Sequence, residues 1–222
     1  MIIGSGLIAK SFINFKNQDD KIIFASGVSN SLEENDLEYQ REINLLKSVL
    51  KKNSNKKIIY FSTTSIFNIK SKYTNHKLEI ERFITQNFNN YCIYRLPQIV
   101  GKGGNRNNLI NFLKQSIIDT KQIIIFTNSL RSILDIEDLV VLCSETCDLK
   151  DKNILNIAGV EFYKIEDIVK LISEKLNMNP ILSFHREKRD CYMINSDEID
   201  IVIKKLNINS NNYIKNIINK YI

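Results

Sequence analysis

Short runs of aliphatic and β-branched residues alternate along the chain with longer stretches in which apolar residues recur at helical spacing. The short runs predict strands at residues 1–3, 22–25, 57–62, 91–96, 122–126 and 154–157. The longer stretches predict helices at residues 7–15, 37–50, 73–88, 136–147 and 165–176. Because strands that alternate with helices form a parallel sheet covered on both faces, the pattern predicts an α/β, Rossmann-like fold.

Composition narrows the class of protein. The chain has 222 residues, of which 43% are hydrophobic and 25% charged, so it can bury a core. Its 31 Lys and Arg exceed its 25 Asp and Glu, but the lysines are spread along the chain beside Asn and Ile. No basic stripe and no helix-turn-helix signature is visible, so we expect anionic small molecules as ligands and no nucleic acid.

Location and redox state are predicted in the same way. No apolar run reaches the ~18–20 residues of a membrane span, and no signal peptide is visible, so we expect a cytoplasmic protein without a membrane partner. The four cysteines are scattered and lack further ligands at metal-binding spacing, which predicts reduced, buried thiols and no metal site. They are Cys92, Cys143, Cys147 and Cys191.

A glycine turn follows the first predicted strand. Gly4-Ser5-Gly6-Leu7-Ile8-Ala9 has the G-x-G-x-x-A pattern of a dinucleotide-binding turn, in which backbone N–H groups at a helix start hold phosphates. A tight turn without a ligand is the alternative. No carboxylate ends the strand at 22–25, so the sequence does not distinguish NAD from NADP.

A Thr–Tyr–Lys set carries the chemistry. Thr63 follows the strand at 57–62, and Tyr73 and Lys77 form a Y-x-x-x-K pair that lies on one face of a helix. A lysine ammonium beside a phenol favours the phenolate, which can exchange a proton with a carbinol oxygen, while a threonine hydroxyl holds that oxygen. We expect His76 to point away from this face, into solvent.

The ordered series of motifs resembles the extended short-chain dehydrogenase/reductase superfamily, of the NAD-dependent epimerase/dehydratase type that acts on nucleotide sugars. The resemblance covers almost the whole chain. It rests on the glycine turn, on Phe24-Ala25-Ser26-Gly27, Ser62–Phe67, the Y-x-x-x-K pair, Tyr94-Arg95-Leu96-Pro97, Val100-Gly101 and residues 131–139. It implies a nucleotide-binding and catalytic core at 1–158 and a small substrate-binding lobe at 159–222.

The resemblance also implies roles for individual residues. The catalytic residues are Thr63, Tyr73 and Lys77. The residues that bind the NAD or NADP cofactor are Gly4, Gly6, Leu7, Ile8, Ala25, Ser26, Gly27, Lys77 and Pro97. Thr64, Ser65 and Arg131 contact the nucleotide-sugar substrate. A homodimer, formed through the helix that carries Tyr73 and Lys77, is a further expectation.

The chain departs from the family pattern in two places. Only about fifteen residues separate Ala9 from Phe24, so we expect the family's second and third strands to be absent, with the first strand near a sheet edge. Cofactor binding is then expected to be weak or completed by another chain. The loop between Thr63 and Tyr73 is also short, which predicts an open substrate cleft.

These features lead to one preferred function and two alternatives. Thr64 and Ser65 stand where the family's dehydratases have an acidic pair, which disfavours dehydration. The preferred reading is an NAD(P)-dependent oxidoreductase that reduces a keto-sugar nucleotide in surface polysaccharide biosynthesis. A C4 epimerase is one alternative, and a non-catalytic relative that binds a nucleotide sugar is the other.

Overall fold

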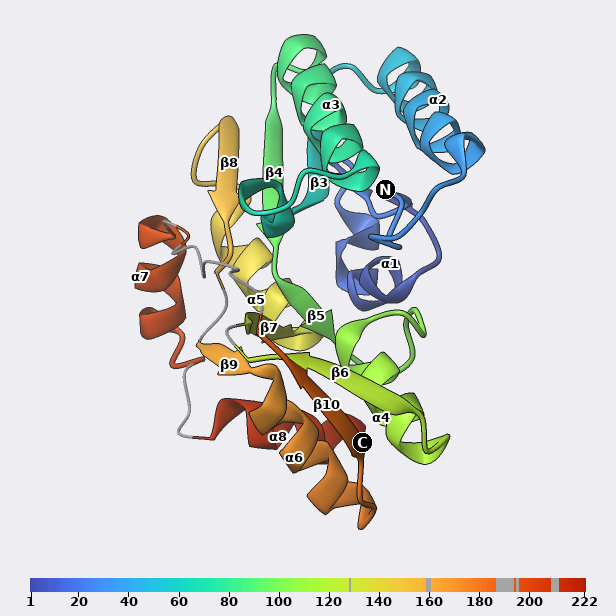
Figure 1. Ribbon diagram of the computed structural model, residues 1–222. Helices are drawn as coiled ribbons and strands as arrows, with labels where there is room; N and C mark the ends of the chain where they lie inside the picture. Colours follow the sequence, from blue (N-terminus) through green and yellow to red (C-terminus); the bar gives the residue numbers. More distant parts are fainter. Residues whose placement is uncertain (128, 159–160, 187–193, 195, 209–211) are drawn as a thin grey trace.

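The central sheet is parallel throughout (Figure 1). The structure is a computed structural model of residues 1–222, and it describes all of them except 128, 159–160, 187–193, 195 and 209–211. The strand order is β1-β2-β3-β4-β8. These strands are β1 (Ile2–Ile3), β2 (Lys21–Phe24), β3 (Lys57–Thr63), β4 (Tyr91–Leu96) and β8 (Lys152–Asn156).

Alternate residues of a strand point to opposite sides of the sheet. The buried strands carry apolar side chains on both sides, and helices cover both faces. Ile58 and Tyr60 of β3 pack into a core with α2 and α3, whereas Ile59 and Phe61 pack into a second core with α1 and α5. The first pair of helices is α2 (Asp36–Lys52) and α3 (Lys72–Asn87), and the second pair is α1 (Leu7–Ser11) and α5 (Ile136–Thr146).

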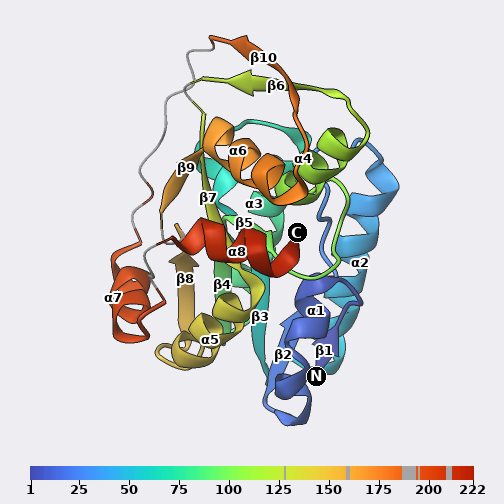
Figure 2. The same ribbon diagram turned by 90° about the horizontal axis from the view of Figure 1, so that it is seen from below.

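Two smaller sheets extend the second core (Figure 2). One has the order β5-β7-β9, and the other pairs β6 with β10 in parallel. Their strands are β5 (Gln98–Val100), β6 (Gln122–Phe126), β7 (Leu130–Asp135), β9 (Phe162–Lys164) and β10 (Ile181–His185). The accompanying helices are α4 (Leu109–Ile118), α6 (Ile165–Leu176), α7 (Asp197–Lys205) and α8 (Tyr213–Tyr221).

The predicted Rossmann-like architecture is confirmed, including its unusual edge. β1 pairs with β2, and it is the terminal strand of the main sheet within the described residues. Between α1 and β2 the chain forms a 3₁₀ helix, Ile13–Asn17, and no strand. The strand predicted at 122–126 exists, but it pairs with β10 and not with the central sheet. The division at 158/159 stays a prediction, and 159 itself lies outside the described residues.

The cysteines and the helix lengths complete this comparison. Cys92, Cys143 and Cys147 are free and buried, as predicted, and Cys191 lies outside the described residues. Within the part of the chain that the structure describes, no helix has the length and apolar character needed to cross a membrane.

Candidate functional site

The glycine turn lies against the loop that follows β2. Both features come at the carboxyl ends of neighbouring parallel strands, the edge where α/β proteins bind ligands. Gly4 has a φ of +127°, and a Cβ atom there would lie 2.3 Å from the carbonyl oxygen of Ala25. Gly6 is exposed, and a Cβ atom there would meet no other atom within 4 Å. The turn therefore packs tightly on one side and stays open on the other.

Leu7, Ile8 and Pro97 are three further residues predicted to bind the cofactor. Leu7 begins α1 and lies close to Gly101 and Gly104, in the loop after β5. Ile8 packs against the apolar core from the same helix. Pro97 joins β4 to β5.

The carboxyl end of β3 presents the predicted threonine. The Thr63 side chain caps the short 3₁₀ helix η2 (Thr64–Phe67) by accepting a hydrogen bond from the backbone N–H of Ser65 at 3.1 Å. That bond uses a lone pair of the hydroxyl oxygen and leaves its hydrogen free to donate. Thr64 is oriented differently, because its hydroxyl donates to the carbonyl oxygen of Leu96 at 3.2 Å and so joins β3 to β4.

Helix α3 brings Tyr73 and Lys77 onto one face. Ser71 forms a capping box with Thr74, which fixes the start of the helix directly before Tyr73. The Lys77 ammonium nitrogen lies 5.7 Å from the centre of the Tyr73 ring. Tyr73 is half-buried, whereas Lys77 is only 2% exposed. The predicted catalytic pair thus lies on one face of α3, with the Lys77 ammonium beside the Tyr73 ring.

Arg131 occupies a different part of the molecule. It lies on β7, in the β5-β7-β9 sheet, where its guanidinium donates to the carbonyl oxygen of Leu130 at 2.9 Å. Its predicted contact with the substrate stays a prediction.

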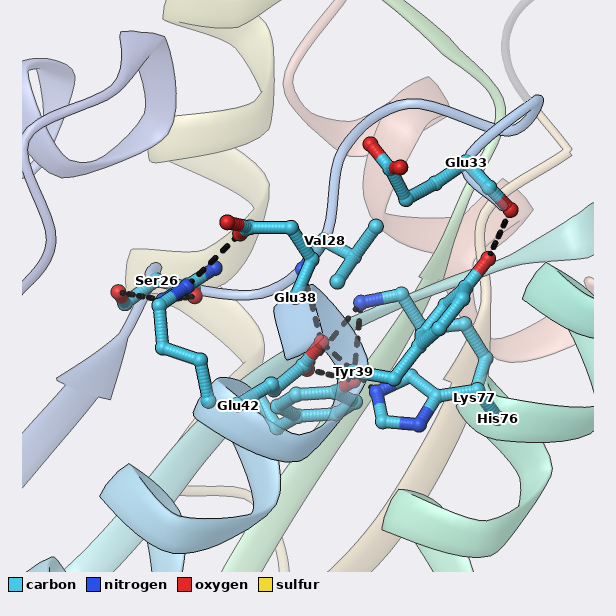
Figure 3. A network of polar contacts seen from close by, with 10 residues as sticks. Ser26, Val28, Glu33, Glu38, Tyr39, Glu42, His76 and Lys77 are labelled. Carbon is cyan, nitrogen blue, oxygen red and sulfur yellow. Dashed lines mark hydrogen bonds and ion pairs between the residues drawn. The ribbon is translucent and has the colours of Figure 1, made fainter. Parts of the chain in front are cut away.

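The partners of Lys77 were not predicted from the sequence. Its ammonium donates to Oε1 of Glu42 at 3.3 Å (Figure 3). It also donates to the hydroxyl of Tyr60 at 3.0 Å. Tyr60 in turn donates to the same Glu42 oxygen at 2.7 Å. Oε2 of Glu42 accepts from the backbone N–H of Val28 at 2.7 Å and from Nε2 of His76 at 3.0 Å. The carboxylate thus has two donors on each oxygen, which fills its accepting capacity.

The electrostatics of this cluster favour an ionised Glu42. Complete burial would raise the pKa of Glu42, but the charge of Lys77 and the hydrogen bonds from His76, Tyr60 and Val28 outweigh it and hold the pKa well below its usual range. Burial, followed by the adjacent Glu42 charge, raises the pKa of Tyr60 well above its ordinary value. Tyr60 is therefore a neutral hydrogen-bonding group and not a second proton donor at neutral pH.

The expectation for His76 was wrong. Its side chain is 5% exposed, and its ring lies 4.7 Å from the ring of Tyr39, measured between centroids. Because an ionised carboxylate only accepts hydrogen bonds, Nε2 of His76 carries the hydrogen in the contact with Glu42. Position 76 lies one helical turn before the buried Ile80, which places the imidazole on the buried side of α3.

The chain was compared with protein families, curated proteins and solved structures, and only solved structures match it. No protein-family model matches the chain, and no curated protein matches its sequence. Solved structures match at low identity. UDP-glucuronic acid 4-epimerase from Bacillus cereus, solved with UDP-glucuronic acid and NAD, has a TM-score of 0.71 at 17% identity, covering 95% of this chain and 76% of that one.

Two further structures have the same fold. MoeE5, solved with UDP-glucuronic acid and NAD, has a TM-score of 0.71 at 13% identity, covering 99% of this chain and 83% of that one. dTDP-glucose 4,6-dehydratase from Bacillus anthracis strain Ames, solved with NAD, has a TM-score of 0.70 at 14% identity, covering 93% and 73%. The chain thus shares the fold of these three solved structures and spans 73–83% of their length.

Proposed function

We propose that the chain is an NAD(P)-dependent oxidoreductase that acts on a nucleotide sugar and reduces a keto group. The observation that carries this proposal is the position of Tyr73 and Lys77 on one face of α3, the helix that follows Thr63 and η2 in the chain. The fold shared with NAD-bound structures of proteins that act on nucleotide sugars supports the proposal.

The glycine turn fits a dinucleotide. Gly4 allows the close approach to Ala25, and the space beside Gly6 leaves backbone N–H groups accessible for phosphate oxygens. Gly4, Gly6 and Leu7 would hold the pyrophosphate, and Ala25, Ser26 and Lys77 would line the nicotinamide half. When bound, a nicotinamide dinucleotide supplies the hydride that reduces the ketone carbon.

The protein supplies the proton and the orientation. Tyr73 donates its phenolic proton to the ketone oxygen as the carbon is reduced, and the product is an alcohol. Thr63 donates a hydrogen bond to the same oxygen and aligns it, because its hydroxyl hydrogen is not used in capping η2. Lys77 places a positive charge near the phenolate that remains on Tyr73.

A C4 epimerase is the second candidate. The match to UDP-glucuronic acid 4-epimerase favours it, because such an enzyme oxidises and then re-reduces one carbon with the same set of groups. The two candidates differ in stoichiometry. A reductase consumes one reduced cofactor for each product, whereas an epimerase interconverts two sugars without added reductant.

The test uses a panel of UDP-, GDP- and dTDP-linked 4-keto-sugars with NADH or NADPH, followed by loss of nicotinamide absorbance. Tyr73→Phe is expected to lower turnover by about 100-fold or more while keeping NADH affinity, because it removes only the proton donor. Tyr91→Phe is the matched control. Tyr91 is the first residue of β4 and so lies at the amino end of that strand, away from the carboxyl ends, and this variant is expected to keep turnover.

Each outcome has a definite meaning. Turnover of Tyr73→Phe within twofold of the wild type contradicts the proposed mechanism. If NMR shows that a UDP-hexose is interconverted without added reductant, the protein is an epimerase and the reductase proposal is wrong. Binding of a nucleotide sugar without turnover of any substrate favours the non-catalytic alternative.

A further inference from the structure

Glu42 is a buried charge with an unusual number of partners. Its side chain is 0% exposed, and burial of a carboxylate is costly unless it is paired and fully hydrogen-bonded. Here the ammonium of Lys77 supplies the opposite charge, and Val28, Tyr60 and His76 supply three further hydrogen bonds. The cluster is therefore specific in geometry, and the removal of one partner changes the placement of the others.

The partners of Glu42 come from separate parts of the fold. Val28 belongs to the loop after β2, and His76 and Lys77 belong to α3 (Figure 3). Tyr60 belongs to β3. One carboxylate oxygen holds the loop, and the other holds the ammonium. Glu42 consequently fixes the position of Lys77 relative to the loop that contains Ala25, Ser26 and Gly27.

Gly27 shows how closely the loop and the lysine meet. A Cβ atom at Gly27 would lie 2.7 Å from Nζ of Lys77 and 2.8 Å from Oε1 of Glu42. Only a residue without a side chain leaves the ammonium in this place. The ammonium has three N–H donors, and two of them are used by Glu42 and Tyr60 among the described residues. One N–H remains for a ligand.

We propose that Glu42 is a positioning residue that holds the Lys77 ammonium against the loop at Gly27 and directs its remaining N–H toward the ribose hydroxyls of the cofactor. This inference rests on the proposed function and deepens it. Tyr60 and His76 support Glu42 from the two sides. The interaction makes Lys77 rigid before the cofactor binds, so less conformational freedom is lost on binding.

The test compares Glu42→Gln with Glu79→Gln, a matched change at an exposed position of α3 that has no hydrogen bond or ion pair among the described residues. Two quantities are measured: the dissociation constant for NADH, from nicotinamide fluorescence, and the rate at which an acylating reagent modifies Lys77, from peptide mass spectrometry. Glu42→Gln is expected to weaken NADH binding and to speed modification of Lys77, each by about tenfold or more. Glu79→Gln is expected to change neither.

Gly27→Ala is the second variant, and it decides the question if Glu42→Gln does not fold. It keeps the side chains of Glu42 and Tyr60 but adds a methyl group 2.7 Å from Nζ of Lys77 and 2.8 Å from Oε1 of Glu42, so the ammonium and the carboxylate must move away from the loop. The same two changes are expected. Wild-type NADH affinity in folded Glu42→Gln, or in folded Gly27→Ala, overturns the positioning role even if Lys77 becomes more reactive.

The two proposals fail in different ways. If the wild-type protein binds neither NADH nor NADPH, the proposed function fails, and the labelling of Lys77 alone then decides whether Glu42 fixes it. If the wild type binds NADH and Glu42→Gln binds it equally well, the proposed function stands and the positioning role falls.

Discussion

Replacement of Tyr60 by Phe tests the energetics of the buried cluster. The substitution removes one hydroxyl from a residue that is 0% exposed and leaves the ring in place. That hydroxyl donates to the Glu42 carboxylate at 2.7 Å and accepts from the Lys77 ammonium at 3.0 Å. A hydrogen bond to a charged group contributes about 1.5–3 kcal/mol to stability. Because the remaining partners compensate in part, we expect a loss of about 2–4 kcal/mol in the free energy of unfolding.

The measurement is urea unfolding followed by far-UV circular dichroism, since the chain has no tryptophan to report by fluorescence. For a chain of this length, a loss of about 2–4 kcal/mol in the free energy of unfolding corresponds to a fall in Tm of about 4–16 °C in thermal unfolding. Tyr91→Phe is the control, because the Tyr91 hydroxyl has no hydrogen-bond partner among the described residues, and we expect a change within about 0.5 kcal/mol. A loss below about 0.5 kcal/mol for Tyr60→Phe would refute the reasoning about the cluster.

Two further predictions concern other parts of the fold. Burial raises the pKa of Cys92 and of Cys147 to about 11, so at pH 8 only about one thiol in a thousand is ionised. Iodoacetamide is expected to leave both unmodified in the native protein and to alkylate both in denaturant, and rapid native alkylation of either would contradict this. The Tyr213 hydroxyl accepts from the backbone N–H of Asp135 at 2.9 Å, where α8 meets the start of α5. Tyr213→Phe leaves that buried N–H without its partner and is expected to cost about 1–3 kcal/mol in urea unfolding, whereas an unchanged midpoint would show that α8 adds nothing there.

The central sheet could be predicted because its strands and helices carry local signals. The apolar run at 57–62 and the helical spacing after Tyr73 mark β3 and α3. The short distance between Ala9 and Phe24 leaves no room for another strand–helix unit between α1 and β2. The pairing of β6 with β10 could not be predicted in this way. These strands lie far apart in the sequence, and their register depends on tertiary contacts that no local pattern encodes.

The sequence contains one indication of the buried cluster, which is recognised once the buried face of α2 is known. Tyr39, Glu42, Leu46 and Val49 follow one another at helical spacing, and all four are buried in α2. A glutamate on the apolar face of a helix is unusual, because a buried charge needs an opposite charge nearby. The sequence alone does not indicate that Lys77 provides it, since the two residues meet only when α2 and α3 pack side by side.

The central claim is that the glycine turn and the Thr63–Tyr73–Lys77 set serve a nicotinamide dinucleotide. Titration of the wild-type protein with NADH and with NADPH, followed by nicotinamide fluorescence, tests it most directly. The account predicts saturable binding of at least one of them below about 1 mM. It also predicts weaker binding when Gly4 is replaced by Val, because a Cβ atom there would lie 2.3 Å from the Ala25 carbonyl oxygen. The absence of saturable binding of both dinucleotides would contradict the claim.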